Sequence, residues 1–326
     1  MKFFLMLLTL NTLLNPLFCE MHHHYLKKNS IQNNSYTWEE EKSHFDELLI
    51  SWNAFRPHKG YYNIYARVKT ENWSDWLLYA TWGSGFQKGT ISEKKGIARV
   101  YQDAVEILEG FGQAFAIKIV AEEGAELSNI KSLHVCASSL SAPSKVKRKK
   151  RNKSYSLAFS PLSQMEIKDE RKERLCSPTS TAAVVRYLKK QQELDPLQFA
   201  ENVWDATFDI YGNWVFNVAE AFHQIHDPSY ACWVERLSSF DQVLKSLKKG
   251  FPVVISIKGP IPNSALPYNQ GHLLVITGYD HKTKEVLCMD PAFQKKEQTK
   301  VRYKLKDLKK AWKRRQNIAY IFEKIT

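Results

Sequence analysis

The sequence predicts a chain of two parts, an all-β sandwich over residues 38–140 followed by an α+β domain over residues 160–326. The first part alternates apolar and polar residues with a period of two, as half-buried strands do. The second part begins with a helix and continues into strands separated by short turns, which is an α+β pattern. With 326 residues, 44% of them hydrophobic, the chain is long enough for two domains with a sizeable core.

The amino-terminal residues are typical of an export signal. One basic residue, Lys2, precedes an apolar run that extends to Phe18, so we expect residues 1–20 to form a secretory signal peptide. Cys19 occupies the position at which a lipoprotein is acylated, but the bulky residue before it favours ordinary cleavage. We therefore expect an exported protein that is periplasmic, envelope-associated or secreted. Residues 21–37 are polar and are expected to form a flexible lead-in.

Alternation in the first part is clearest over residues 62–68, 115–119 and 133–137. Turns that contain glycine or proline separate such stretches, and short strands at these intervals favour a β-sandwich. Tryptophans on alternating strands usually fill the core. A carbohydrate-binding platform is the alternative for the four in this part: Trp52, Trp73, Trp76 and Trp82.

Residues 141–159 are expected to form a basic linker between the two parts. Residues 1–143 carry a net charge of −1 and residues 144–326 carry +14, with seven basic residues in Lys145–Lys153. A block of like charges repels itself and stays extended, so a solvated spacer is the first interpretation. The alternatives are contact with an anionic membrane or envelope, at about 1 kcal/mol per basic residue, and cleavage that separates the domains. Specific binding of nucleic acid is not expected of an exported protein.

Cys176 is the candidate nucleophile. It precedes a Ser-Pro-Thr sequence and a helical run that continues to about Gln192. Pro178 suits the first turn of a helix, and Ser177 or Thr179 could cap it. The free N–H groups and the dipole of a helix N-terminus favour a thiolate. A single free cysteine is nevertheless more often a small buried apolar residue than a nucleophile.

Three further residues complete the set that a cysteine acyl-transfer site needs. Taken singly, Gln164 is an ordinary surface glutamine, His272 a strand histidine and Asp290 the end of a strand before a turn. Together with Cys176 they give glutamine, cysteine, histidine and aspartate in that order. Other histidines could serve as the base, but they lie in no comparable motif: His223, His226 and His281.

Five motifs of the second part resemble those of the C39-like cysteine peptidases, and more closely those of a secreted bacterial branch of that family. They are Ser163-Gln164-Met165, the stretch from Leu175 to Thr181, the stretch from Gly212 to Asn217, the stretch from Gly271 to Gly278, and Asp290-Pro291-Ala292. The motifs occur in this order over most of residues 160–326. The family often has tryptophan at the position of Leu175, a difference that alters packing beside the site. Residues 51–54 and 73–76 resemble the N-terminal half of the same family more weakly.

The resemblance implies a papain-like fold and a reaction through a thioester. Cys176 would attack a carbonyl as a thiolate, His272 would act as general base and then general acid, and Asp290 would orient the imidazole. Gln164 and the backbone N–H of the nucleophile would form the oxyanion hole. The resemblance thus implies a peptide or protein substrate, cleaved at a peptide or isopeptide bond, and implies no cofactor and no metal.

Two rival functions remain open from the sequence. The first keeps the thioester but passes the acyl group to an amine, as an acyltransferase does, or acts on the cell wall as an amidase. The second is an inactive envelope-binding module that has kept the fold. The presence of all four candidate site residues argues against the second rival.

The five cysteines show no CxxC pair and no metal-ligand spacing. Cys19 belongs to the export segment, and Cys176 must stay reduced if it is catalytic. Export permits a disulfide, but the sequence does not demand one. The remaining three are expected to be buried free thiols: Cys136, Cys232 and Cys288.

Overall fold

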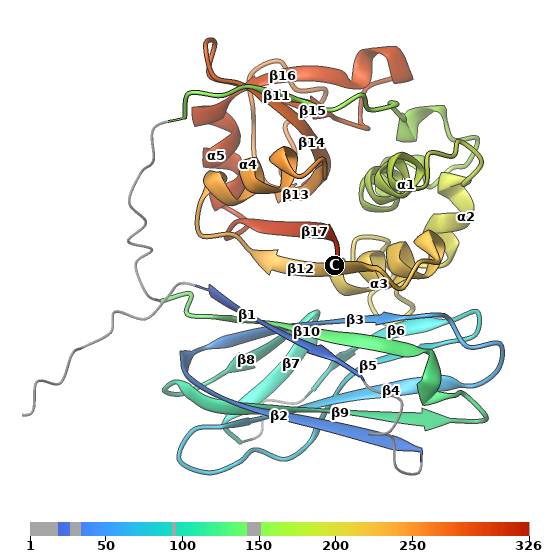
Figure 1. Ribbon diagram of the computed structural model, residues 1–326, viewed down its shortest axis with the longest axis vertical. Coiled ribbons are helices and arrows are strands. Elements are labelled where there is room, and N and C mark those ends of the chain that lie inside the picture. The colour runs from blue at the N-terminus through green and yellow to red at the C-terminus, as the bar shows by residue number, and fades with distance from the viewer. Residues whose placement is uncertain (1–18, 27–33, 93–95, 142–150, 326) are drawn as a thin grey trace, which may run out of the picture.

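The computed structural model describes residues 19–26, 34–92, 96–141 and 151–325, which divide into a β-rich half and an α+β half (Figure 1). Most of the expected signal peptide, and the part of the basic run that precedes residue 151, lie outside the described residues. Of the helices in these ranges, none has the length and apolar character needed to cross a membrane.

In the described part of the β-rich half, ten strands form one antiparallel sheet that folds over into two layers (Figure 1). In sequence order they are β1 (Cys19–Tyr25), β2 (Ser35–Phe45), β3 (Glu47–Ala54), β4 (Tyr61–Lys69), β5 (Leu77–Gly83), β6 (Gln87–Ile91), β7 (Ala98–Gln102), β8 (Ala104–Ile107), β9 (Gly112–Glu122) and β10 (Ile130–Ser138). Their order in the sheet is β1-β10-β3-β8-β7-β6-β5-β4-β9-β2. The sheet turns over at β6, because this strand pairs with β5 through residues 87–89 and with β7 through residues 90–91.

The predicted alternation of buried and more exposed residues is seen in β4, in one layer, but not in β10, in the other. β4 buries every second side chain, as its sequence pattern predicts. β10, in contrast, is buried on both faces over residues 132–138. The physical reason is that the second half of the chain covers the outer side of this layer, where β3 and β10 lie.

The four tryptophans of this half divide between core and surface. Trp52 and Trp82 are fully buried and pack edge to face, with ring centroids 6.2 Å apart. Trp73 and Trp76 are half-buried on the outer side of β4. The guanidinium of Arg67 lies over both of these outer rings, 4.3 Å and 4.6 Å from their centroids. Two of the four therefore fill the core, as expected, and two face solvent under a cation.

The expected flexible lead-in of residues 21–37 is wrong over Met21–Tyr25, which belong to β1, and over residues 35–37, which belong to β2. The whole of β1 pairs in register with β10, from Cys19 opposite Ser138 to Tyr25 opposite Ser132. The polar sequence suggested a solvated segment, but one side of the strand's backbone is paired with β10 at the edge of the sheet. The Cys19 sulfur lies 2.9 Å from the Cys136 sulfur.

The α+β half has a central antiparallel sheet with helices on both faces (Figure 1). Its helices are α1 (Cys176–Lys189), α2 (Pro196–Glu201), α3 (Trp214–Ile225), α4 (Phe240–Lys248) and α5 (Leu305–Lys313). Its strands are β11 (Tyr155–Ser156), β12 (Tyr230–Arg236), β13 (Val253–Ile257), β14 (His272–Asp280), β15 (Glu285–Met289), β16 (Lys300–Lys304) and β17 (Ile318–Lys324). The sheet order is β12-β17-β13-β14-β15-β16, with β11 beside β14.

Successive side chains of β14 enter two different cores. Leu273 and Val275 pack with α1 and α3 on one face, and Leu274 and Ile276 pack with α4 and α5 on the other. A strand that is covered on both faces has a continuous apolar sequence rather than an alternating one. His272, the first residue of β14, lies at the end of this buried strand.

The expected linker of residues 141–159 ends inside the second sheet. β11 pairs with β14, with Tyr155 opposite Tyr279. The pairing depends on Gly278, because a Cβ atom there would lie 2.5 Å from the Tyr155 carbonyl oxygen. Arg151, at the end of the basic run, forms an ion pair with Asp241 at 2.8 Å. The described end of the linker is thus part of the α+β half.

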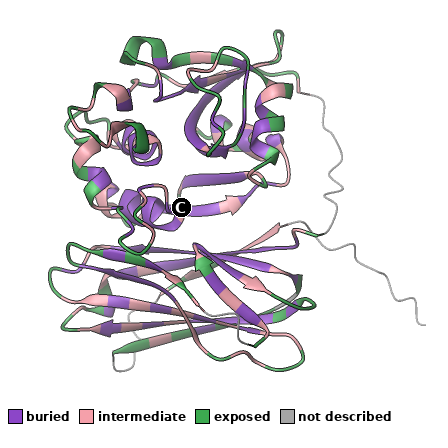
Figure 2. Cartoon of the chain, turned by 180° about the vertical axis from the view of Figure 1, so that it is seen from behind, coloured by how far each residue is buried: buried purple, intermediate pink, exposed green. Residues whose placement is uncertain are grey.

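The two halves share a buried interface, seen in Figure 2 as the purple elements where they meet. α3 and β12 pack against β3. The side chain of Asn53 donates to the Cys232 carbonyl at 2.6 Å and accepts from the Cys232 N–H at 2.9 Å. Arg236 donates to both carboxylate oxygens of Glu47, at 2.5 Å and 2.7 Å, and both side chains are buried.

Candidate active site

Cys176 is the first residue of α1 and keeps partial exposure. The expected cap was wrong. Leu175 occupies the N-cap position without a side-chain hydrogen bond, while the Ser177 hydroxyl lies 2.9 Å from that of Tyr320. The thiol is nevertheless at a helix N-terminus, where the first N–H groups have no partner within the helix.

His272 and Asp290 form a buried pair beside this helix start. The imidazole N–H at Nε2 donates to the Asp290 Oδ1 atom at 2.8 Å, and both side chains are at most 5% exposed. The carboxylate can only accept, so it fixes the proton on Nε2 and leaves Nδ1 as the other bonding atom of the ring. The ring also lies close enough to the Cys176 side chain for the two groups to interact, because His272 lowers the pKa of the thiol and the thiol raises the pKa of the imidazole. Cysteine, histidine and aspartate are therefore connected in that order.

The charges of this set favour a thiolate and an imidazolium. Desolvation raises the pKa of Cys176, but the interactions with His272 and with the backbone of Leu273 and Ser177 together lower that pKa by more, so the net direction is down. Burial lowers the pKa of His272, but the negative charge of Asp290 and the hydrogen bond with it, together with smaller contributions from Cys176, outweigh burial and raise the pKa of the imidazole to about 10. Asp290 stays ionised, because its contacts with the imidazole and two hydroxyl groups lower its pKa despite burial.

Two tyrosines that sequence reasoning missed hold the carboxylate of Asp290. The hydroxyl groups of Tyr268 and Tyr303 each donate to its Oδ2 atom at 2.7 Å. The ring of Tyr268 also stacks on the imidazole of His272, with centroids 4.0 Å apart and planes 8° apart. Tyr268 comes from the loop before β14 and Tyr303 from β16. Neither lies in a chemical motif, so only the fold identifies them.

Gln164 is buried between two segments that border the set. Its backbone N–H donates to the Pro291 carbonyl at 2.9 Å, just after Asp290. Its side-chain Nε2 donates to the Lys172 carbonyl at 2.8 Å, four residues before Cys176. The Oε1 atom is buried without a partner among the described residues. Gln164 therefore contacts the approach to the helix through its side chain and the turn after Asp290 through its backbone.

The three rival histidines have other partners. His223 accepts a hydrogen bond from the Arg56 N–H at 3.1 Å, and the ring of His226 packs on that of Phe55 at 4.6 Å. His281 lies in a turn, 2.8 Å from the Ser154 hydroxyl. All three are thus occupied away from the thiol, and His272 is the histidine that contacts it.

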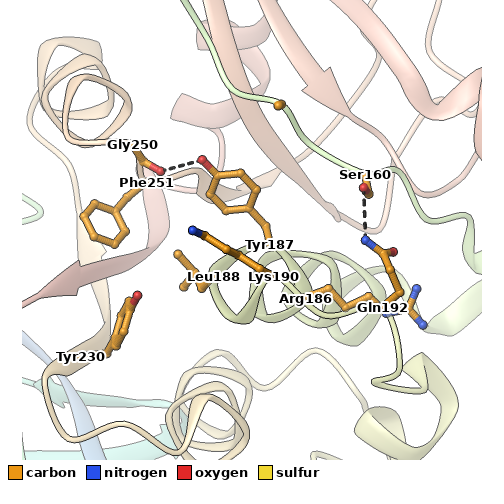
Figure 3. Close-up of a pocket in the computed structure, with 10 residues that line it drawn as sticks. Ser160, Arg186, Tyr187, Leu188, Lys190, Gln192, Tyr230, Gly250 and Phe251 are labelled. Carbon is orange, nitrogen blue, oxygen red and sulfur yellow. Dashed lines mark hydrogen bonds between the residues drawn. The ribbon is translucent and has the colours of Figure 1, made fainter.

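A cavity of about 520 Å³ lies at the other end of α1 (Figure 3). It is bordered by Tyr187, whose hydroxyl donates to the Gly250 carbonyl at 3.1 Å, and by Gln192, whose amide lies 3.4 Å from the Ser160 hydroxyl. The 14-residue helix separates this cavity from Cys176 by about 20 Å. It is therefore not the surroundings of the thiol.

Comparison with known proteins supports the assignment of this half. Residues 156–320 match the family model described as the Peptidase_C39 like family. The match takes in slightly more than half of the 326 residues and includes the four candidate site residues. A search of curated proteins found no match. The chain belongs to the Peptidase_C39 like family.

Proposed function

We propose that the protein is a cysteine peptidase with a papain-like catalytic arrangement, and that it hydrolyses a peptide or isopeptide bond through a thioester on Cys176. The observation that carries the proposal is the buried connection from the thiol through His272 to Asp290, at the start of α1. A thiolate is the reactive form of cysteine, and each part of this arrangement stabilises the thiolate or the imidazolium beside it.

In the proposed reaction the Cys176 thiolate attacks the carbonyl carbon of the substrate and its C=O bond becomes an oxyanion. The oxyanion then collapses, the carbon–nitrogen bond breaks, and the Nδ1 proton of His272 passes to the leaving amine. Water attacks the resulting thioester while His272 takes one of its protons. The carbon–sulfur bond breaks and the thiolate is restored.

Two N–H groups are assigned to the oxyanion. One is the backbone N–H of Cys176, which belongs to the unpaired first turn of α1. The other is the second Nε2 hydrogen of Gln164, since only one hydrogen of that amide is used by the Lys172 carbonyl. Removing one such donor typically costs about 10²–10³ in rate.

A thiol-reactive peptidyl electrophile tests the proposal most directly. The wild-type protein should be labelled once, and Cys176→Ala and His272→Ala should both lose the label. His223→Ala is a matched control, because it removes another partly buried histidine of the same half without touching the proposed site. Labelling that survives Cys176→Ala, or no labelling of the wild type, would contradict the proposal.

A digest of an unbiased peptide library, run beside Cys176→Ala, then identifies the reaction. Hydrolysis gives a new carboxyl terminus. Addition of a primary amine separates the two fates of the thioester, because an acyltransferase would give mainly the amide of the added amine. A product that is mainly the amide would replace hydrolysis by acyl transfer as the function.

A further inference from the structure

Arg315 lies near the proposed site with a guanidinium group that has no carboxylate partner among the described residues. It follows α5 in the turn before β17 and is half-buried. Its Nε atom is buried and has no hydrogen-bond partner in the described part of the chain. Buried polar groups are almost always paired, so an unpaired nitrogen in an arginine calls for an explanation.

The guanidinium lies directly against the backbone that leads into His272. A Cβ atom on Gly271, the preceding residue, would come within 2.6 Å of the Nη2 atom of Arg315. The lack of a side chain at Gly271 therefore makes room for the guanidinium. The Arg315 carbon Cζ also lies 5.9 Å from the centre of the Trp214 ring, at the start of α3.

The same group is electrostatically close to the start of α1. The Tyr320 hydroxyl lies 2.9 Å from that of Ser177, the residue after Cys176. Burial has the largest effect on the pKa of this tyrosine and raises that pKa. The negative charge of the Cys176 thiolate also raises the pKa, and the positive charge of Arg315 lowers it. The charge of Arg315 thus acts on the tyrosine that contacts the first turn of α1, and the guanidinium itself borders Gly271, next to His272.

A second arginine beside the same tryptophan shows what Arg315 lacks. The Cζ atom of Arg236 also lies 5.9 Å from the centre of the Trp214 ring, but Arg236 is paired through two nitrogens with Glu47. A guanidinium matches a carboxylate in this two-point geometry. Within the described residues, Arg236 thus has a carboxylate partner and Arg315 does not.

We propose that Arg315 binds a carboxylate of the substrate beside the scissile bond, so that the enzyme selects acidic substrates. The carboxylate belongs either to an aspartate or glutamate side chain or to the free carboxyl terminus of a peptide. Trp214 provides a flat apolar wall for the carbon atoms next to that carboxylate. This inference rests on the proposed peptidase function and adds the substrate class to it.

Paired peptides test the inference. One set has blocked ends and carries glutamate or glutamine, or aspartate or asparagine, at each position near the scissile bond. A second set carries a free or an amidated carboxyl terminus. We expect wild-type kcat/KM to favour the acidic member at one position by roughly 10- to 100-fold, the range for a hydrogen bond to a charged group. The set that shows the preference identifies the source of the carboxylate.

Arg315→Gln should bring this ratio close to one. Arg314→Gln is the matched control, because Arg314 is the exposed neighbour whose Nη1 atom donates to the Lys258 carbonyl at 3.1 Å, and it should keep the ratio. Circular dichroism and the unfolding midpoint report whether each variant is folded. Arg315→Lys is a second variant that keeps the charge, and it should keep part of the preference.

The outcomes separate the two proposals. Wild-type protein that cleaves acidic and amide peptides equally in both sets would overturn the inference and leave the peptidase function standing. A preference that persists in folded Arg315→Gln would overturn it as well. Wild-type protein that neither cleaves the peptides nor reacts with the electrophile would overturn the peptidase function, and the inference with it.

Discussion

Two buried histidines, one in each half of the molecule, differ in a way that explains the site. His134 lies on β10 and is fully buried, and His272 on β14 is nearly so. His134 contacts His23, Ser132 and Asn53, with nitrogen-to-partner distances of 2.7 Å, 2.8 Å and 3.3 Å. His272 contacts the carboxylate of Asp290 at 2.8 Å.

Burial alone lowers the pKa of a histidine, because the charged form loses its hydration. His134 follows that rule: burial, with a smaller contribution from the charge of His23, holds its pKa well below the ordinary value. For His272 the charge and hydrogen bond of Asp290, with smaller contributions from Cys176, reverse the result and raise the pKa. The comparison teaches that the carboxylate, rather than burial, makes the second histidine able to hold a proton beside a thiolate.

Asp290→Asn removes the carboxylate that distinguishes His272 from His134, and it should have the largest effect on kcat/KM. The amide can still accept from His272 and meet the two tyrosine hydroxyl groups, but it has no charge. We expect kcat/KM to fall by roughly 10²–10⁴-fold, the range for a general acid–base pair that loses its orienting carboxylate. The alkaline limb of the pH profile should also move to lower pH, because the pKa of His272 falls. A variant with an unchanged alkaline limb would contradict the role given to Asp290.

Tyr268→Phe changes the support of Asp290 and so alters the difference between His272 and His134 without removing it. The phenyl ring keeps its stacking on His272, and Asp290 keeps the hydroxyl group of Tyr303. One hydrogen bond to a charged group is lost, so we expect about a tenfold drop in kcat/KM and a small shift of the alkaline limb. Tyr303→Phe removes the other hydroxyl bond to the same oxygen and should act alike. A drop in activity with an unmoved pH profile would indicate a purely structural role.

His134→Gln tests the other side of the comparison of the two histidines, through the pH dependence of the free energy of unfolding. Because the folded pKa of His134 lies below the unfolded value, its contribution to stability is complete above about pH 6.5 and is lost as the pH falls toward the folded value. Wild-type protein should therefore lose up to about 1.4 kcal/mol of unfolding free energy per pH unit below that point through this group. His23 faces the ring, and the pKa of His23 is lowered mainly by burial, so it contributes in the same direction.

Urea unfolding between pH 5 and pH 8 measures this effect. The free energy of unfolding should depend less steeply on pH in His134→Gln than in the wild type. His281→Gln is a suitable control, since that ring lies in an exposed turn. Equal pH dependence in wild type and His134→Gln would contradict the conclusion that folding lowers the pKa of His134 while it raises that of His272.

The sequence predicted what local patterns encode. The helix start at Cys176, the strand start at His272 and the strand end before Asp290 follow from apolar runs and turn residues that are close in the chain. The predicted helix to about Gln192 ends instead at Lys189, because Lys190 adopts a left-handed conformation with φ of 55°. Such ends depend on single backbone angles and are hard to read from a sequence.

Contacts between distant segments could not be predicted in the same way. Tyr268 and Tyr303 meet at one oxygen atom although 34 positions separate them in the chain. β1 looked like a solvated lead-in because its partner strand, β10, lies more than a hundred residues away. Arg315 belongs to a run of basic residues, and only the fold distinguishes it from its neighbours.

The interface between the halves determines whether a single proteolytic cut between them would separate them. Asn53 pairs with the backbone of Cys232 as a neighbouring strand would, and Glu47 neutralises Arg236 out of reach of water. A protease that cut once between residues 141 and 151 would leave these contacts untouched. The two fragments would separate on a denaturing gel yet elute together from a sizing column, so proteolysis there would not release the α+β half.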